Sequence, residues 1–432
     1  MKTFYISILF IAFGLAQVKA QIPAASQNGA ILILGGTLHK GDGEVLENAA
    51  IAFDKGVITL VGNAAQRNII PTDYKQVIKA DGKHIYPGFI ASNINIGLTE
   101  IDEVRATHDF NETGNFNPNV RSLVSYNTDS KVMYTVRTNG ILLAQSCPRG
   151  GTISGTSSLF ALDGWNWEDA VYKADEGIHL NWPGFYGFNW SEHGRGAMEK
   201  NKNHDSQVQE IVKFFDDAKA YCNTKSPAVI NLRYESMREI FNGTQNLYLH
   251  AAGANEISES ILFAKDKSIA KPVLVGGRDA MTVKELIKKQ NVPVILERLH
   301  SLPASTDRDV DEPYRLASDL TKEGITVALG YEGDMEVMGS RNLPFQAGTS
   351  VAYGLNIEEA LKLITSNPAK IYGLTKTGTL NEGMDATLFI STGDALDMRT
   401  NNVEQAFIRG KNIELKNHQT ELYDKYKGKY GF

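Results

Sequence analysis

PGFIASNINIG, residues 87–97, has the pattern of a buried strand that ends at a site. Its first half is apolar, polar residues take alternate positions toward its end, and Gly97 follows them. Strands buried in parallel sheets read as apolar runs, and the last side chains of such a strand reach the functional site. Asn93 and Asn95 are therefore expected either to bind a polar ligand or to satisfy each other's hydrogen bonds.

Strand-like and helix-like segments alternate through the middle of the chain. This alternation predicts a parallel α/β fold, and a (β/α)8 barrel is the commonest solution at this length. The expected strands are residues 140–146, 247–251, 272–276, 292–296 and 325–330, and the expected helices are residues 205–221, 255–267, 282–290 and 314–323.

A Gly-rich and aromatic-rich segment, residues 150–188, interrupts this pattern. It is too long and bulky for a plain connection, so we expect a lid over the mouth of the barrel. Its aromatic residues form either a wall for a carbohydrate or peptide ligand or the packing of the lid itself. Lys173 lies in a stretch within it that has the pattern of a middle strand.

The two ends and the composition suggest an exported globular protein. Residues 1–20 have a positive start, an apolar run too short to span a bilayer and a small residue at the end, as in a secretory signal peptide. The net charge of -6 is spread along the chain, which gives no sign of a nucleic-acid surface. Cys147 and Cys222 are either two free thiols or one disulfide. We expect a periplasmic or secreted protein with no membrane span after cleavage.

Residues 87–97 resemble the first barrel strand of the amidohydrolase superfamily, which reads P-G-[LF]-I-D-x-H-x-H-x-G. Ala91 stands in place of the Asp, and Asn93 and Asn95 stand in place of two metal-binding histidines. Residues 30–62, 378–390 and 403–411 resemble the strands that flank the barrel in this superfamily. The resemblance, to the imidazolonepropionase-like and dipeptidase-like branch, implies an α/β fold with a TIM-like (β/α)8 barrel, residues 87–370. The barrel is inserted in a small β-sandwich built from residues 21–86 and 371–432.

The resemblance also locates the other site positions. His250 matches the histidine that ends strand five, and Gly276 replaces the strand-six histidine. At the position of the strand-eight Asp that acts as general base stands Glu332 or, two residues on, Asp334. Each residue has a structural reading too: His250 as a packed histidine, and Arg278 as a rim ion pair with Asp279. The expected catalytic residues are His250 and Glu332, and the expected substrate-binding residues are Asn93, Asn95 and Arg278.

The family uses one or two zinc-like divalent ions, and this sequence has lost most of their ligands. An Asn amide is uncharged and a weak ligand, so we predict no metal cofactor. The alternative is a hard ion such as Ca²⁺, which accepts amide and carboxylate oxygens.

Two functions follow from the resemblance. The first is a hydrolase acting on carbon–nitrogen bonds other than ordinary peptide bonds, with Glu332 and His250 acting on a water and a small-molecule or peptide-like ligand in the mouth. The second is a catalytically inactive barrel that binds a ligand or joins an active paralogue, as a homo-oligomer or a hetero-oligomer.

Overall fold

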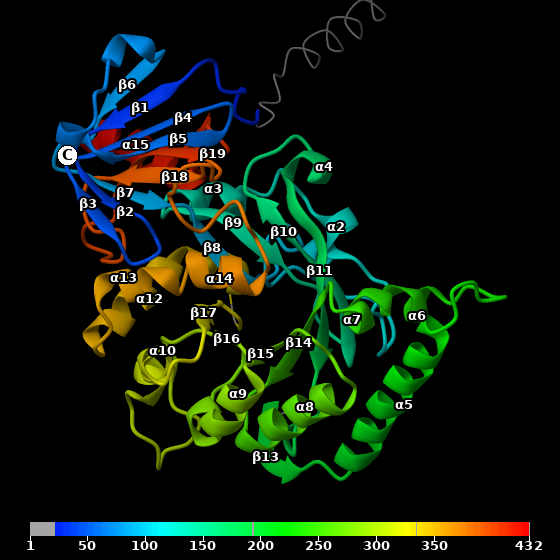
Figure 1. The fold of residues 1–432 in the computed structure, drawn as a ribbon. Helices are drawn as coiled ribbons and strands as arrows, with labels where there is room; N and C mark the ends of the chain where they lie inside the picture. Colours follow the sequence, from blue (N-terminus) through cyan, green and yellow to red (C-terminus); the bar gives the residue numbers. More distant parts are fainter. Residues whose placement is uncertain (1–21, 192–193, 334, 432) are drawn as a thin grey trace, which may run out of the picture.

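The computed structural model describes residues 22–191, 194–333 and 335–431, and its largest sheet forms a nearly closed barrel (Figure 1). The sheet has the strand order β17-β16-β15-β14-β11-β10-β9-β8, and a parallel bridge between Ser92 and Gly330 joins its two edges. The predicted TIM-like barrel is confirmed. Its strands are β8 (Phe89–Ile94), β9 (Ile141–Ser146), β10 (Ile153–Ala161), β11 (Val171–Asn181), β14 (Asn246–Ala251), β15 (Pro272–Gly276), β16 (Val294–Leu296) and β17 (Val327–Leu329).

One strand departs from the all-parallel pattern, because β10 runs antiparallel to both β9 and β11. The expected lid over residues 150–188 is therefore wrong for most of that segment, which supplies two strands of the barrel wall. Gly155 shows why the composition misled: its φ is +139°, and a Cβ there would come within 2.6 Å of the Val120 carbonyl oxygen. The glycine serves a close approach of two backbones rather than a loop.

Helices cover the outside of the barrel, as predicted (Figure 1). On α5 the apolar residues Ile211, Phe215 and Ala218 recur at helical spacing, and all three are buried. The longer helices are α5 (His204–Cys222), α8 (Ala254–Asp266), α10 (Glu312–Lys322), α12 (Leu343–Ala352) and α15 (His418–Tyr430). The shorter ones are α2 (Ser122–Ser125), α3 (Lys131–Arg137), α4 (Trp167–Ala170), α6 (Leu232–Ser236), α7 (Arg238–Asn242), α9 (Lys284–Gln290), α11 (Glu336–Gly339), α13 (Ile357–Lys362) and α14 (Ser366–Ile371).

Both ends of the chain build the flanking sandwich, as predicted. One sheet has the order β5-β4-β1-β6, and the other has the order β20-β19-β18-β7-β2-β3. The antiparallel pairing of β18 with β7 ties the two ends together, and Ile33, Phe53, Leu388 and Phe407 share one buried apolar cluster between the sheets. The strands are β1 (Ile31–Leu34), β2 (Thr37–His39), β3 (Val45–Glu47), β4 (Ala49–Asp54), β5 (Val57–Asn63), β6 (Gln76–Lys79), β7 (His84–Pro87), β18 (Leu388–Ser391), β19 (Val403–Ile408) and β20 (Lys411–Ile413). A separate hairpin, β12 (Tyr186–Ser191) and β13 (Gly194–Lys200), follows the barrel strand β11.

The structure also decides the state of the two cysteines and the role of two aromatic residues of the predicted lid. Cys147 and Cys222 are both free thiols. Trp182 packs on Phe263 and Phe185 stacks on His204, so these two aromatic residues pack on the helices that follow them in the chain. The predicted signal peptide and Asp334, the alternative to Glu332, lie outside the described residues. In the part of the chain that is described, no helix combines the length and the apolar character needed to span a bilayer.

Candidate functional site at the barrel mouth

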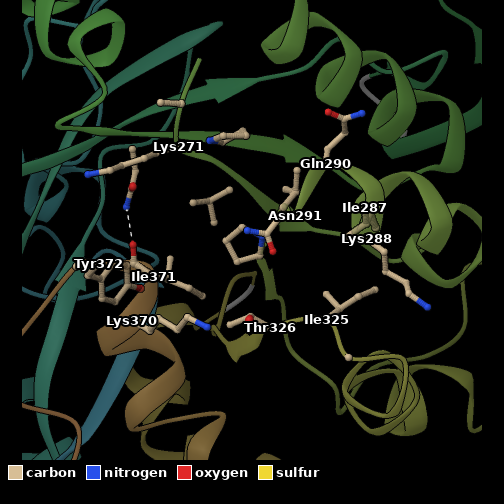
Figure 2. Close-up of a pocket in the computed structure, with 18 of the residues that line it drawn as sticks. Lys271, Ile287, Lys288, Gln290, Asn291, Ile325, Thr326, Lys370, Ile371 and Tyr372 are labelled. Carbon is tan, nitrogen blue, oxygen red and sulfur yellow. Dashed lines mark hydrogen bonds between the residues drawn. The ribbon is translucent and has the colours of Figure 1, made fainter. Parts of the chain in front are cut away.

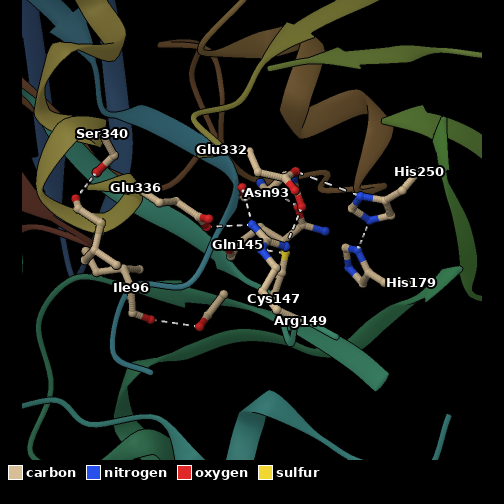
Figure 3. A network of polar contacts seen from close by, with 12 residues as sticks. Asn93, Ile96, Gln145, Cys147, Arg149, His179, His250, Glu332, Glu336 and Ser340 are labelled. Carbon is tan, nitrogen blue, oxygen red and sulfur yellow. Dashed lines mark hydrogen bonds and ion pairs between the residues drawn. The ribbon is translucent and has the colours of Figure 1, made fainter. Parts of the chain in front are cut away.

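Three of the five predicted site residues meet at the carboxyl-terminal end of the barrel. Asn93 lies in β8, His250 near the end of β14, and Glu332 shortly after β17. The Asn93 amide donates to Oε2 of Glu332 at 2.6 Å, and Nδ1 of His250 lies 3.9 Å from the same oxygen. Figure 3 shows His250 between Glu332 and His179. The sequence thus located a group of side chains that the fold brings together.

Asn93 has an unusual backbone conformation, with a φ of +51°. Asn adopts this left-handed region more readily than most residues, and here it breaks the regular pairing of β8 with β9. As a result, the Asn93 N–H donates to Oε1 of Gln145 at 2.9 Å, and the Asn93 carbonyl turns toward Arg149. The amide is therefore fixed by its backbone as well as by Glu332.

Arg149, which the sequence analysis did not single out, is the central cation of the mouth. It follows β9 and donates to Oδ1 of Asn93 at 3.0 Å, to the Asn93 carbonyl at 2.9 Å and to Glu336 at 2.6 Å. Burial opposes its charge, but the charges of Glu336 and Glu332 outweigh burial and raise the pKa of Arg149. A guanidinium that donates charge-assisted hydrogen bonds to several oxygens holds them in place, so Arg149 fixes Asn93 and Glu336 relative to one another.

Asn95 and Arg278 lie apart from this group. Asn95 is 5% exposed, its backbone N–H donates to Glu336, and its side-chain oxygen has no hydrogen-bond partner among the described residues. Arg278 lines a small neighbouring cavity of about 100 Å³ and lies 3.5 Å from Asp279, so the rim ion pair is present. The structure therefore does not bring Arg278 together with Glu332 and His250.

A buried polar chain supports His250 from inside the barrel. Nε2 of His250 lies 2.8 Å from Nδ1 of His179, and Nε2 of His179 lies 2.8 Å from the hydroxyl of Ser157. Ser157 in turn donates to Glu176 at 2.6 Å. Burial lowers the pKa of His250 to about 4, and it lowers the pKa of His179 well below the usual range. Both imidazoles are therefore neutral at pH 7.

This chain fixes the proton on each imidazole. Because the single proton of Ser157 goes to Glu176, Nε2 of His179 must be the donor to Ser157. Nδ1 of His179 then accepts a hydrogen bond, so Nε2 of His250 carries the proton. Nδ1 of His250 consequently presents a lone pair toward Glu332. Two hydrogen-bond acceptors thus face one another across 3.9 Å at the mouth.

Glu176, at the inner end of the chain, accepts from three side chains. Besides Ser157, Gln145 donates to it at 2.6 Å and Tyr248 at 2.6 Å. Burial raises the pKa of Glu176, and these hydrogen bonds act in the opposite direction. Three donors on one buried carboxyl group match the needs of its ionised form.

Two more carboxyl groups of the mouth have raised pKa values. Burial and the neighbouring charge of Glu332 raise the pKa of Glu336 to about 7, although Arg149 pulls it down. Glu297 is exposed, but the surrounding protein removes part of the water around its carboxylate. This desolvation, with the charge of Glu332, raises the pKa of Glu297 to about 7. Glu332 itself differs: burial would raise its pKa, but Arg149, His250 and the Asn93 amide hold it below the usual value.

The residues present do not fit a zinc-like ion. Among the residues that the structure describes, no three or more His, Cys, Asp or Glu side chains are grouped as around a metal. Nε2 of His250 is hydrogen-bonded to His179, and Oδ1 of Asn93 accepts a hydrogen bond from Arg149, so neither atom is free to bind a metal. The guanidinium also puts a fixed positive charge against Glu336 and near Glu332. A transition metal needs three or four free ligands and no competing cation.

Several of these residues could not be found from motifs. Arg149 and Glu336 come from segments that follow strands, and His179 lies in the segment assigned to a lid. One signal was available for His179: VYKADEGIHLN, residues 171–181, has a strand pattern, and a strand end is where a barrel places a functional histidine.

Comparisons with known proteins agree with this architecture. The solved amidohydrolase from Thermotoga maritima MSB8 matches 89% of this chain and 99% of its own, at 22% identity and a TM-score of 0.76. A Xaa-Pro dipeptidase with bound methionine matches 89% of this chain and 100% of its own, at 14% identity and a TM-score of 0.54. The A. niger ochratoxinase matches 89% of this chain and 96% of its own, at 15% identity and a TM-score of 0.54.

At these identities the likeness to the solved structures shows the fold alone. No curated protein matches the sequence. A sequence model of the amidohydrolase family, however, matches residues 192–413, slightly more than half of the chain. With the barrel, the flanking sheets and this match together, the chain belongs to the amidohydrolase family.

Proposed function

We propose that the barrel mouth is a hydrolytic site for carbon–nitrogen bonds other than ordinary peptide bonds, and that it works without a resident transition metal. The observation that carries the proposal is the pair of acceptors, Nδ1 of His250 and Oε2 of Glu332, which face one another at 3.9 Å. One water molecule can donate a proton to each of them. A water held in this way is positioned for attack on a carbonyl carbon.

The chemistry assigned to the pair is acid–base catalysis. Glu332 takes a proton from the water while the water oxygen bonds to the carbonyl carbon, and the same proton passes to the nitrogen as the carbon–nitrogen bond breaks. Glu332 suits the first step because its lowered pKa keeps it ionised. His250 stays neutral and orients the water, because burial lowers its pKa to about 4.

The test is turnover of a panel of linear and cyclic amides by matched variants. Glu332→Gln and His250→Asn should each abolish hydrolysis of any amide that the wild type cleaves. Arg278→Gln, which changes a charge on the rim outside the pair, should keep most of it. An unchanged rate in Glu332→Gln would contradict the assignment.

Elemental analysis checks the metal-free part of the proposal separately. Protein produced with Zn²⁺, Mn²⁺ and Ca²⁺ in the medium and purified without chelators should hold far less than one equivalent of a transition metal. One tightly held equivalent would mean that other side chains complete a metal site, and a metal-dependent hydrolase would replace the present proposal.

A second candidate is a catalytically inactive barrel that binds a ligand or joins an active paralogue. One observation favours it: Arg149, Asn93 and Glu336 bind one another, so groups at the mouth are used internally. Absence of amide hydrolysis, together with a stable mixed oligomer with an intact homologue, would support this candidate. In both cases we place the protein outside the cytoplasm, on the strength of residues 1–20.

A further inference from the structure

The opposite end of the barrel holds a cavity of about 440 Å³, larger than the small cavity that Arg278 lines. It opens where the strands begin, beside Asn246 at the start of β14 and Pro272 at the start of β15. Figure 2 shows Lys271, Asn291 and Lys370 around it. Its other walls come from the loops before β16 and β17 and from the end of α14. A volume of this size is typical of sites for small molecules.

The charged side chains that line this cavity are all lysines. Lys173, Lys271, Lys288 and Lys370 contribute to its wall, and no Asp or Glu is among the described residues that line it. Lys288 pairs at 3.1 Å with Glu323, which also binds Lys284, and Figure 2 shows the Lys288 side chain extending away from the other labelled lysines.

The other three lysines differ in their partners. Lys173 donates at 2.6 Å to the carbonyl of Tyr372, at the end of α14, and its charge acts on the buried Glu176. Among the described residues, the side chain of Lys271 reaches only the neutral Thr244 carbonyl, at 3.4 Å. For Lys370 the described residues provide no hydrogen bond or ion pair. The positive charges of Lys271 and Lys370 therefore border the cavity without a neighbouring carboxylate.

The remaining wall is mixed in character. Amides of Asn246, Gln290 and Asn291 lie among apolar groups such as Ile287 and Ile325. Ammonium groups bind carboxylates and phosphates as point charges, amides accept or donate hydrogen bonds, and the apolar wall suits a carbon skeleton. This combination is what a small organic anion requires.

We propose that this cavity, at the amino-terminal end of the barrel, is a binding site for a small organic anion with carboxylate or phosphate groups, held by Lys271 and Lys370. The site is separate from the mouth and independent of the hydrolytic proposal. Asn246 connects this site to the barrel interior. It lies in the same strand as Tyr248, β14, and its side-chain amide donates to the Tyr248 hydroxyl at 3.0 Å.

Calorimetric titration of the full chain at low ionic strength tests the site, with citrate, inorganic phosphate and neutral glycerol as probes. We expect one citrate or phosphate per chain, no binding of glycerol, and an affinity about tenfold lower in Lys271→Gln/Lys370→Gln. Tighter binding of citrate would identify a polycarboxylate site, and tighter binding of phosphate a phosphate-ester site.

Lys288→Gln is the matched control, because this lysine lines the same cavity but is paired with Glu323. Its anion affinity should stay close to that of the wild type. Labelling of lysine amines gives a second readout: citrate or phosphate should protect Lys271 and Lys370, but not the surface Lys213. No binding of either anion, an equal loss in Lys288→Gln, or no protection would overturn the proposal.

Discussion

The two ends of the barrel hold charge in opposite ways. At the mouth, Arg149 is enclosed by Asn93 and Glu336, and its charge is compensated within the protein. At the base, Lys271 and Lys370 border an open cavity whose wall, in the described part of the chain, contains no carboxylate. A buried charge without a partner is costly, whereas a solvated charge is not. At the mouth, the stability of the fold therefore depends on the charges. At the base, the charges of Lys271 and Lys370 contribute little to the stability of the fold.

The largest expected effect is at the mouth. Arg149→Met should lower the free energy of unfolding by about 3–5 kcal/mol, because it leaves Glu336 buried without its partner. Unfolding in urea measures the change. Arg278→Met, on the exposed rim, should change it by less than about 0.5 kcal/mol. Adding Glu336→Gln to Arg149→Met should recover part of the lost free energy of unfolding. If Arg149→Met alone lost as little as Arg278→Met, the mouth would not depend on its charges for stability.

An intermediate effect depends on pH and concerns His250. Its pKa is about 4 in the folded protein and 6.5 in an unperturbed chain, so the unfolded chain takes up a proton first as the pH falls. The stability that the neutral histidine provides is present above pH 6.5 and is lost toward pH 4, by about 3 kcal/mol.

Unfolding free energies of the wild type and His250→Asn between pH 4 and 8 measure this effect. The wild type should show the steeper fall below pH 6.5, and the two slopes should coincide above pH 7, where His250 is neutral in both states. Parallel curves over the whole range would show that His250 is not held neutral by burial.

The smallest effect is expected at the base. Lys271→Gln/Lys370→Gln should change the free energy of unfolding by no more than about 0.5 kcal/mol, and at low salt the change should be toward higher stability, because two like charges are removed. Thermal unfolding at low and high salt measures it. A clear destabilisation would show that these lysines serve the fold, and would remove the contrast between the two ends.

The sequence predicted the barrel and part of the mouth, because those features depend on local pattern. Runs of apolar residues identify buried strands. The resemblance to the amidohydrolase superfamily then pointed to His250 and Glu332 at the ends of two of these strands. Arg149 and Glu336 were missed because their segments come together only in three dimensions. Asn93 was placed correctly, but its left-handed backbone and its bond to Arg149 follow from the bulge in β8, which no motif encodes.

The antiparallel β10 was missed for a different reason. Glycines that allow close backbone contact and glycines that form loops give the same composition, and only the neighbour at Val120 distinguishes them. His179 and Glu176 were lost with that segment, and with them the chain that sets the protons on the imidazoles.

The seam between β8 and β17 has a consequence for the order in which the chain folds. Ile90, near the start of β8, donates to the carbonyl of Ile364, and Leu329, at the end of β17, donates to that of Leu363; both carbonyls follow α13. Residues 363–364 thus stand between the strands, and a bridge joins Ser92 to Gly330 further along. During synthesis the barrel can close only after residue 364 has emerged, more than 270 residues after β8 begins at Phe89. Until then β8 remains an unprotected edge, at which a nascent chain is open to aggregation.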